Sequence, residues 1–330
     1  MNKRLMIADL DEGKIITNDS SCYFLIKRSS VKTGKNNAQY IDLELTDGLK
    51  TIGGKIWEVT EEVESIVEDG NIIKVLNAKV TRYQSNLQII LDGIKLADIA
   101  DSESYRGIIP ESEFSEEELL KKWNNLKDFL SADHRKVVDE FEKSGKIWEL
   151  FRIIPAGKSM HHAYRKGLLE HSISVSELSL KIAEHYKGAY KLDISLIVLG
   201  SMLHDIGKIF EFQVNSTTGI VEKYSDRGRL LGHIYIGATF LEKVINKSGI
   251  ENTEFKMEFL HIILSHHGEY EFGSPKKPKT MESLIVSMAD NMDANLNAVH
   301  IGFNNEMDEN WTKTIYSLQR PFFRSKGEDA

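Results

Sequence analysis

The sequence is poor in cysteine, with Cys22 as its single example among 330 residues. One thiol cannot form an internal disulfide, and it leaves no thiolate cluster for zinc. Any bound metal ion must therefore be held by histidines and carboxylates. The chain has eleven histidines, so such a site is feasible.

Long apolar runs are absent as well. No stretch approaches the roughly 18 apolar residues that a membrane-spanning helix needs, and residues 1–13 lack the apolar core of a signal peptide. We therefore expect a cytoplasmic protein that does not bind membranes. With 41% hydrophobic and 28% charged residues, the chain is long enough for two folded domains.

The net charge of −8 argues weakly against a nucleic-acid-binding protein when it is taken as one number. Its distribution is more informative. Residues 1–100 have a net charge of only −2, while the short stretch 101–118 has a net charge of −6. In contrast, residues 151–169 contain four basic side chains and no acidic one. This segment is either a local cationic patch or a solvated surface loop.

Residues 1–100 have the pattern of a small β-barrel. They contain five segments rich in β-branched and aromatic residues, and the residues at 61–68 recur at helical spacing between the third and the fourth segment. The expected strands are 22–32, 40–45, 51–59, 72–83 and 87–97. This order is typical of an OB-like Greek-key barrel.

Barrels of the OB type commonly bind single-stranded nucleic acid by stacking bases on aromatic side chains. The candidates for stacking are Tyr23, Phe24, Tyr40, Trp57 and Tyr83. An aromatic residue in a strand is more often part of the core, so for each of them a core position is the alternative.

The rest of the chain has helical periodicity. Residues 101–118 are acidic and contain a proline, which is typical of a linker between domains. An all-α domain is expected over 119–305. It begins with two amphipathic helices near 119–130 and 137–150, and the second of them is expected to be broken near Gly145. Five further helices are expected at 168–187, 193–205, 232–247, 254–267 and 280–299. The aromatic, basic tail at 306–330 could pack on a neighbouring domain or subunit, so a homo-oligomer is plausible.

The stretch Leu199–Lys208 carries the clearest chemical signal. An apolar helix ends there in the adjacent pair His204 and Asp205. An ionised carboxylate is costly to bury without a partner, and a metal ion satisfies an imidazole and a carboxylate together. Lys208 adds a cation that could bind a phosphate oxygen. The alternative is a structural His–Asp pair at the end of a core helix.

Other potential ligands lie on the apolar faces of the expected helices. They are His171, His233, the adjacent pair His266 and His267, and Asp290. Each alone is more often a satisfied core residue than a ligand. Seven polar residues from five successive helices of one bundle would leave many buried groups without partners unless they converge.

The order His, His-Asp, His, His-His, Asp resembles the metal-dependent HD phosphohydrolase superfamily over about residues 158–297. The resemblance implies a first metal held by His171, His204, Asp205 and Asp290. It implies a second metal held by the bridging Asp205 together with His233, His266 and His267. The Gly-Tyr-Pro signature of cyclic-dinucleotide phosphodiesterases is absent after His267, and Gly167 stands where trinuclear relatives carry Glu, which argues against a third metal.

Together with the barrel, the run Ile154–Ser172 with its His-His-Ala-Tyr-Arg sequence closely resembles the YhaM-type 3′-to-5′ exoribonucleases, which require a divalent metal such as manganese. The resemblance implies hydrolysis of single-stranded RNA, with single-stranded DNA as a further substrate. It also favours two Mn²⁺ ions, although Fe, Co, Ni or Zn suit the same ligands. Only the resemblance supplies the direction of cleavage.

In such a site Asp205 would bridge two metals that activate a water for attack on phosphorus. Lys208 and Arg165 would bind phosphate oxygens, and Lys158, His161 or His162 would add phosphate contacts or protonate the leaving oxygen. Two alternatives remain open. One is an HD-type nucleotide phosphohydrolase or cyclic-dinucleotide phosphodiesterase, and the other is a nucleic-acid-binding adaptor with a structural metal site.

Overall fold

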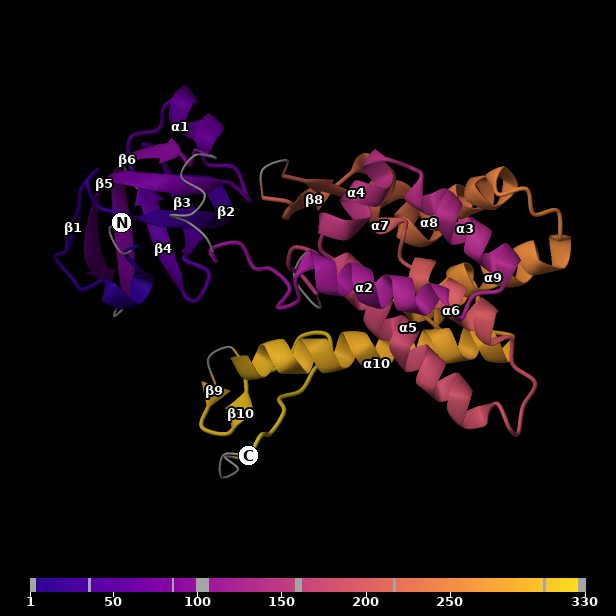
Figure 1. Cartoon of the computed structure of the whole chain (residues 1–330). Coiled ribbons are helices and arrows are strands. Elements are labelled where there is room, and N and C mark those ends of the chain that lie inside the picture. The colour runs from indigo at the N-terminus through magenta and orange to yellow at the C-terminus, as the bar shows by residue number, and fades with distance from the viewer. Residues whose placement is uncertain are drawn as a thin grey trace. The chain divides into compact units, whose positions relative to one another are not determined.

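The structure, a computed structural model, describes residues 4–34, 37–84, 86–98, 107–157, 162–215, 218–304 and 307–325. The chain divides into two compact units (Figure 1). The barrel unit comprises Met1–Glu111 together with Val214–Glu222, and the helical unit comprises Ser112–Gln213 together with Lys223–Ala330. No helix among the described residues is both long enough and apolar enough to cross a membrane.

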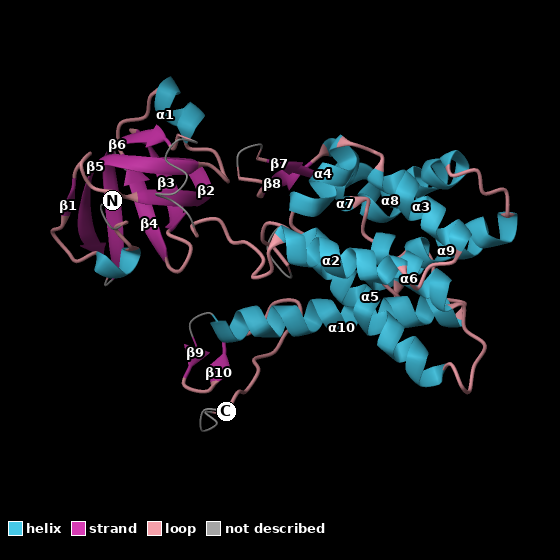
Figure 2. Cartoon of the chain, viewed as in Figure 1, coloured by secondary structure: helices cyan, strands magenta, loops and turns pink. Residues whose placement is uncertain are grey.

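The barrel unit contains a closed barrel with OB topology (Figure 2). Its elements are β1 (Ile15–Ile16), β2 (Tyr23–Thr33), β3 (Gln39–Thr46), β4 (Thr51–Ile56), α1 (Glu61–Ile66), β5 (Ile72–Tyr83) and β6 (Asn86–Leu96). The strands pair in the order β1-β5-β2-β3-β4-β6, and the additional pairing of β5 with β6 closes the barrel. The pair β4 and β6 is parallel, and all others are antiparallel. The five predicted strands and the helix between the third and fourth are confirmed.

The barrel core follows from alternation along the strands. In β3, Ile41, Leu43 and Leu45 are buried and their neighbours are more exposed, as expected when successive side chains point to opposite faces. Gly54 of β4 lies against this row, because a Cβ there would come within 2.8 Å of the Leu45 side chain. The packing of β3 against β4 therefore requires glycine at this position.

Two of the predicted stacking residues are wrong. Phe24 is fully buried inside the barrel, and Tyr23 is 3% exposed. The reason is that the start of β2 is covered on both faces, since Tyr23 packs in a small cluster with Leu25, Ile72 and Ile108. Neither ring can stack on a base while it is buried in this way.

A different pair of predicted residues is accessible. Trp57 is 55% exposed, and its ring centroid lies 5.0 Å from that of Tyr40. The Nζ atom of Lys55 lies 4.5 Å from the Tyr40 centroid. Two aromatic rings and a cation at one point of the surface suit a single-stranded nucleic acid, so stacking by Tyr40 and Trp57 stays a prediction.

The helical unit consists mainly of nine α-helices over its described residues. They are α2 (Glu116–Lys127), α3 (Ala132–Glu142), α4 (Lys146–Ile153), α5 (Gly167–Tyr186), α6 (Ile194–Leu203), α7 (Lys208–Glu211), α8 (Asp226–Lys247), α9 (Thr253–Ser265) and α10 (Met281–Asn304). The strands β7 (Phe212–Val214) and β8 (Val221–Tyr224) pair with each other, and part of each belongs to the segment Val214–Glu222 of the barrel unit. The helical unit also contains the paired strands β9 (Met307–Asp308) and β10 (Trp311–Thr312).

All five long helices expected between residues 168 and 299 are present. The break predicted at Gly145 is also found, because this residue has φ 61° and precedes α4. Helix α2 begins inside the stretch predicted as a linker, where Ser115 and Glu118 form a reciprocal capping box. The short strands β1 and β7 to β10 were not predicted, since their two to four residues carry no resolvable periodicity.

Helix α6 is the centre of the helical unit. Eight of its ten residues are buried, and it contacts α3, α5, α9 and α10 (Figure 1). Gly200 allows α9 to approach closely, because a Cβ there would lie 2.8 Å from Ile262. The helix therefore ends deep inside the bundle, and it delivers His204 and Asp205 there.

Candidate metal centre

The position of Asp205 depends on the turn that follows α6. His204 is the C-terminal cap of that helix, and Gly207 precedes α7. A Cβ on Gly207 would lie 1.9 Å from the carbonyl oxygen of His233, so only glycine permits this approach. The contact brings the turn beside α8 and sets His233 next to Asp205.

The other candidate ligands come from four more helices. His171 belongs to α5, and Asp290 belongs to α10. His266 caps the end of α9, and His267 follows it. In α8 a non-helical residue, Gly232 with φ 69°, precedes His233. The structure brings all seven predicted ligands together.

One group of ligands, site A, consists of His171, His204, Asp205 and Asp290. The Nε2 atom of His171 lies 3.4 Å from Asp205 Oδ2 and 3.1 Å from Asp290 Oδ1. The Nε2 atom of His204 lies 3.4 Å and 3.6 Å from the same two oxygens. The ligand atoms of His171, His204 and Asp290 all lie within 4.8 Å of one another, and these three residues are buried.

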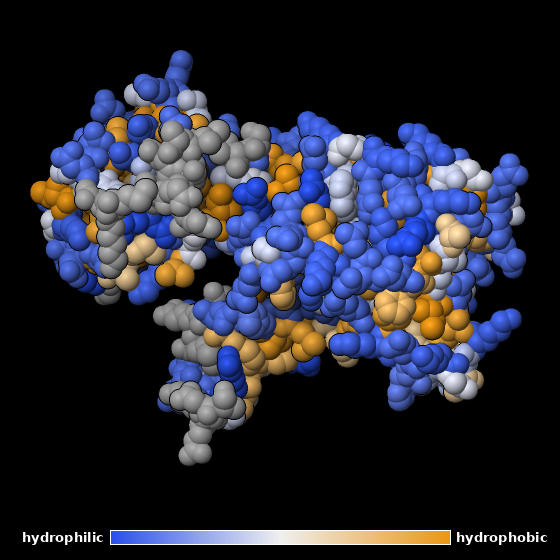
Figure 3. Space-filling view, in the orientation of Figure 1, coloured by the Kyte–Doolittle hydropathy of each residue, from blue (hydrophilic) through white to orange (hydrophobic). Residues whose placement is uncertain are grey.

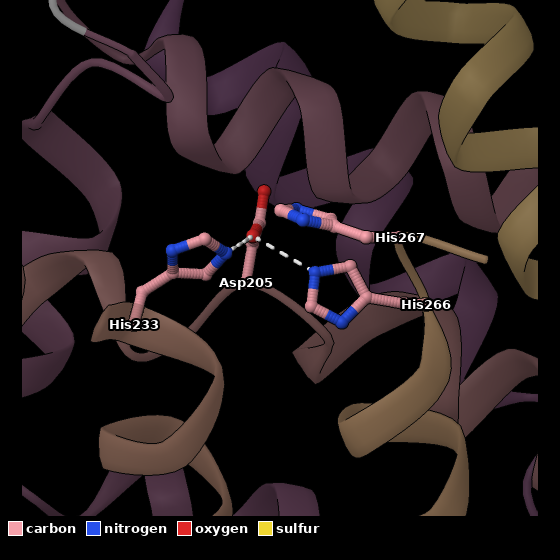
Figure 4. A group of neighbouring side chains, drawn as sticks. All are labelled: Asp205, His233, His266 and His267. Carbon is pink, nitrogen blue, oxygen red and sulfur yellow. Dashed lines mark ion pairs between the residues drawn. The ribbon is translucent and has the colours of Figure 1, made fainter. Parts of the chain in front are cut away.

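A second group, site B, consists of Asp205, His233, His266 and His267 (Figure 4). Here the other oxygen of the carboxylate, Asp205 Oδ1, lies 3.4 Å from His233 Nε2 and 3.5 Å from His266 Nε2. Asp205 therefore presents one oxygen to each group. This is the arrangement of a carboxylate that bridges two metal ions.

The ring orientations favour metal binding at both groups. Each of the five histidines has its Nδ1 atom at hydrogen-bond distance from an acceptor, so each Nδ1–H donates and Nε2 is the ring atom left to bind a metal. The acceptors are Asp293 for His171, the Ser201 carbonyl for His204, Glu211 for His233, the Ile263 carbonyl for His266 and the Phe272 carbonyl for His267. Five Nε2 atoms thus lie around two carboxylates.

Without a cation these contacts would be unfavourable. Asp205 Oδ1, His233 Nε2 and His266 Nε2 are buried and have no hydrogen-bond partner among the described residues. Buried polar atoms without partners are rare in native proteins, and lone pairs that face one another repel. The donor set of imidazole and carboxylate therefore fits divalent transition metals.

Electrostatics leads to the same conclusion. Burial lowers the pKa of His204, but the charges of Asp205 and Asp290 outweigh burial and raise this pKa to about 9. Burial opposes ionisation of Asp205, yet Lys208 and the neighbouring imidazoles hold the pKa of Asp205 well below its usual range. Burial and the neighbouring His266 and His233 lower the pKa of His267 to about 3. Two buried carboxylates thus attract positive charge, and His267 stays neutral and ready to bind a metal.

The comparisons with known proteins agree with this geometry. The sequence model of the HD domain family matches residues 168–295, the stretch that supplies all seven ligands. Residues 168–295 are an HD domain.

Beyond the HD domain, the similarity to a curated relative spans nearly the whole chain. The chain is 28% identical over 305 residues to a protein of Geobacillus sp. (strain WCH70) named 3′-5′ exoribonuclease YhaM, which covers 92% of this chain and 90% of that protein.

Two solved structures show local likenesses. One is the second OB-fold domain of replication protein A from Methanococcus maripaludis, with 20% identity, 29% of this chain and 95% of that chain covered, and a TM-score of 0.22. The other is the HD domain of the phosphodiesterase PgpH from L. monocytogenes, with 19% identity, 46% and 74% covered, and a TM-score of 0.30.

Sequence reasoning missed two carboxylates that orient ligands of the HD domain. Asp293 Oδ2 accepts hydrogen bonds from His171 Nδ1 at 2.7 Å and from His162 Nε2 at 2.9 Å. Glu211 accepts from the backbone N–H of His233 at 3.0 Å. The available signal for Asp293 was its position three residues after Asp290, on the same face of α10.

The predicted role of His162 as a substrate contact is wrong. Its side chain is buried, Nε2 donates to Asp293, and Nδ1 accepts from the Tyr164 hydroxyl at 2.7 Å. Both ring nitrogens are thus used inside the protein. His162, His171 and Asp293 could geometrically hold a further metal, but hydrogen bonds already join them. A side chain at Gly167 would also meet the His162 carbonyl at 2.1 Å, so the Glu of trinuclear relatives cannot fit there.

The predicted cationic residues have different outcomes. Lys208 reaches the centre, where its Nζ lies 2.7 Å from Asp205 Oδ2. Arg165 is half-buried and is not among the residues that line the cavity described below, so its contact with phosphate stays a prediction. Lys158 and His161 lie outside the described residues.

A cavity of about 550 Å³ opens onto the metal centre. Its lining includes Asp205, Lys208, His233, His266, His267 and Asp290. Cavities of this size suit small molecules or a single unit of a polymer. The ligands are therefore accessible to a substrate, although most of them are buried.

Proposed function

We propose that this protein is a metal-dependent 3′-to-5′ exoribonuclease that hydrolyses phosphodiester bonds in single-stranded RNA. The observation that carries the proposal is the bridging position of Asp205, with one oxygen facing each set of imidazole nitrogens. The relative named 3′-5′ exoribonuclease YhaM supports the substrate class and the direction, because the similarity covers the barrel as well as the HD domain.

The protein's own residues prepare the site for this reaction. When bound, two divalent ions would activate a water molecule and neutralise the charge that develops on phosphate. Asp205 would contribute one oxygen to each metal position, and Asp293 and Glu211 keep His171 and His233 in the tautomer that binds metal. Lys208 balances the charge of Asp205 and can turn toward a phosphate oxygen at the cavity wall.

For the metal we favour Mn²⁺, with Fe, Co, Ni and Zn as alternatives. All seven ligands are nitrogen or oxygen donors, and Cys22 is a buried residue of the barrel core, so soft thiolate ligation plays no part in the site. The proposed cofactor content is two ions per chain.

The proposed location is the cytoplasm, and the proposed partner is single-stranded RNA, with single-stranded DNA as a further candidate. Self-association is a further proposal. Large apolar side chains are exposed along one face of α10, where hydrophobic colour gathers in Figure 3. They are Met281, Leu284, Met288, Met292 and Leu296. Exposed apolar patches of this kind commonly mark protein–protein contacts.

The test is cleavage of 5′-labelled RNA by the full-length chain with Mn²⁺, with and without chelator. Asp205→Asn keeps the volume of the side chain and removes its charge, and we expect it to abolish cleavage while RNA binding remains measurable. The matched control is Asp226→Asn, because Asp226 is exposed at the start of α8. We expect the control to behave as the wild type.

Other outcomes would favour other functions. Hydrolysis of mononucleotides or cyclic dinucleotides without cleavage of RNA would make the protein a nucleotide phosphohydrolase or a cyclic-dinucleotide phosphodiesterase. RNA binding without any hydrolysis would make it an adaptor with a structural metal site.

A further inference from the structure

The cavity extends beyond the metal ligands along α10. This helix supplies Asp290 to site A and then lines the same cavity with Asn291, Ala294 and Asn295. At a rise of 1.5 Å per residue, the helix advances about 7.5 Å from residue 290 to residue 295. This length is comparable with one nucleotide of an extended strand, so the cavity has room for one unit next to the cleaved bond.

The wall on α10 offers neutral hydrogen-bonding groups. Asn291 and Asn295 are one turn apart, and the side-chain Nδ2 of Asn295 donates to the side-chain Oδ1 of Asn291. This contact uses neither N–H of the Asn291 side-chain amide, nor the Oδ1 atom and second N–H of Asn295. Ala294 beside them contributes only a methyl group, which keeps space open.

Other parts of the cavity wall are aromatic. Phe272 and Tyr224 line it and are 54% and 43% exposed. The buried ring of Phe212 supports Tyr224 edge-on at 5.3 Å. The Phe272 carbonyl accepts the hydrogen bond from His267 Nδ1, which ties this ring to site B. Exposed rings that line a polar cavity are suited to stacking on a flat ligand.

The C-terminal tail supplies further lining residues. Ser317 and Leu318 line the cavity, and both are uncharged. Apart from the metal ligands, Lys208 and Glu211, the described lining residues carry no charge. A flat, neutral group with hydrogen-bonding edges fits such a surface better than a phosphate does.

We propose that Tyr224, Phe272, Asn291 and Asn295 form a base subsite, which binds the nucleobase of the terminal nucleotide while its phosphodiester lies at the metal centre. This inference rests on the proposed function and adds a residue-level account of how the strand end is held. The subsite accepts any of the four bases. Each base offers both a donor and an acceptor on its Watson–Crick edge, and every base has a face that can stack on an aromatic ring.

The experiment uses the full-length chain with Mn²⁺ and two 5′-labelled RNA oligonucleotides that differ in one respect. One ends in an ordinary nucleotide, and the other ends in an abasic one. Stacking of a base on an aromatic side chain contributes about 1–3 kcal/mol. At about 1.4 kcal/mol per factor of ten, we expect kcat/KM for the terminal linkage to be roughly 5- to 150-fold higher for the ordinary end.

Three variants locate the effect. Phe272→Ala should lower the ratio of kcat/KM between the ordinary and the abasic substrate toward one, and Phe272→Tyr should restore this ratio. Tyr270→Ala is the matched control, because Tyr270 is 62% exposed on the same short 3-10 helix but is not among the lining residues. We expect this control to keep the wild-type ratio.

Two results would overturn the subsite and leave the proposed function intact. One is equal cleavage of the ordinary and the abasic end by the wild type. The other is a loss of kcat/KM in Phe272→Ala that is equally large on both substrates. Such a loss would show that the substitution only disturbs the backbone near His267. If the wild type cleaves neither RNA, the proposed function itself fails.

Discussion

Asp293 gives the most informative single substitution outside the metal ligands. Its carboxylate accepts a 2.7 Å hydrogen bond from His171 Nδ1 and a 2.9 Å bond from His162 Nε2, and its other oxygen accepts one from Ser174. Asp293→Asn keeps the size of the side chain and one acceptor oxygen but removes the negative charge. We expect the variant to fold and to bind metal more weakly at site A.

The magnitude follows from the bond to His171. A hydrogen bond to a charged group contributes about 1.5–3 kcal/mol and a neutral one about 0.5–1.5 kcal/mol. Replacing the first kind by the second therefore costs about 1–1.5 kcal/mol, which corresponds to roughly tenfold weaker metal binding. Losses of 10–100-fold are typical when the partner of a metal-binding histidine is changed.

The assay is titration of the metal-free protein with Mn²⁺ by calorimetry, which resolves stoichiometry and affinity. Ser174→Ala is the control, because it removes only the third hydrogen bond of Asp293 and leaves the bond to His171 in place. It should change affinity by less than about twofold. Wild-type affinity in Asp293→Asn, or an equal loss in Ser174→Ala, would refute the role of Asp293 in orienting His171.

The remaining predictions concern the two units separately. Burial raises the pKa of Cys22 to about 12, so its thiol should react with a thiol reagent at neutral pH only after denaturant unfolds the barrel; fast labelling of the native protein would contradict the barrel core. Phe141 is fully buried against Trp148 and Phe151, so Phe141→Ala should lower the free energy of unfolding of the helical unit by about 3–5 kcal/mol in denaturant titrations, and a change under about 1 kcal/mol would show that this cluster is not packed. Trp57→Ala should weaken RNA binding roughly 5- to 150-fold in fluorescence anisotropy, since one stacked base contributes about 1–3 kcal/mol. Tyr186→Ala, which changes an exposed tyrosine of the helical unit, should leave RNA binding unchanged.

The metal ligands could be predicted from the sequence because the helices that carry them have a clear apolar periodicity. Each ligand is a polar residue at an apolar position of a periodic segment, and the His204–Asp205 pair ends the most apolar helix of the chain. The ligands come from α6 and four other helices of one bundle, and these helices can bury such residues only if the residues meet. The order of ligands along the chain then carried a resemblance that the sequence model of the HD domain family supports over residues 168–295.

The supporting groups could not be predicted in the same way. Glu211 belongs to a helix of four residues, and its contact with His233 depends on the close approach at Gly207. His162 has φ 44° in an irregular segment, so no periodicity indicates that its ring turns inward to Asp293. Such contacts arise from tertiary packing, which local sequence does not encode.

Burial within the barrel shows the same limit. Tyr23 and Phe24 are neighbours in β2, so strand alternation puts them on opposite faces and explains the burial of only one of them, Phe24. The outer face is covered there by Ile108, a residue beyond the last strand whose position no strand pattern indicates. Trp57 lies just past the end of β4, where no such cover is present among the described residues.

The central claim is that Asp205 joins two metal positions, and a metal count tests it most directly. Full-length protein and its variants are loaded with Mn²⁺, freed of excess metal and measured for metal per chain by mass spectrometry. The account predicts two ions in the wild type, one in His233→Ala, and none retained in Asp205→Ala. Two ions in Asp205→Ala, or a single ion in the wild type, would contradict the bridge.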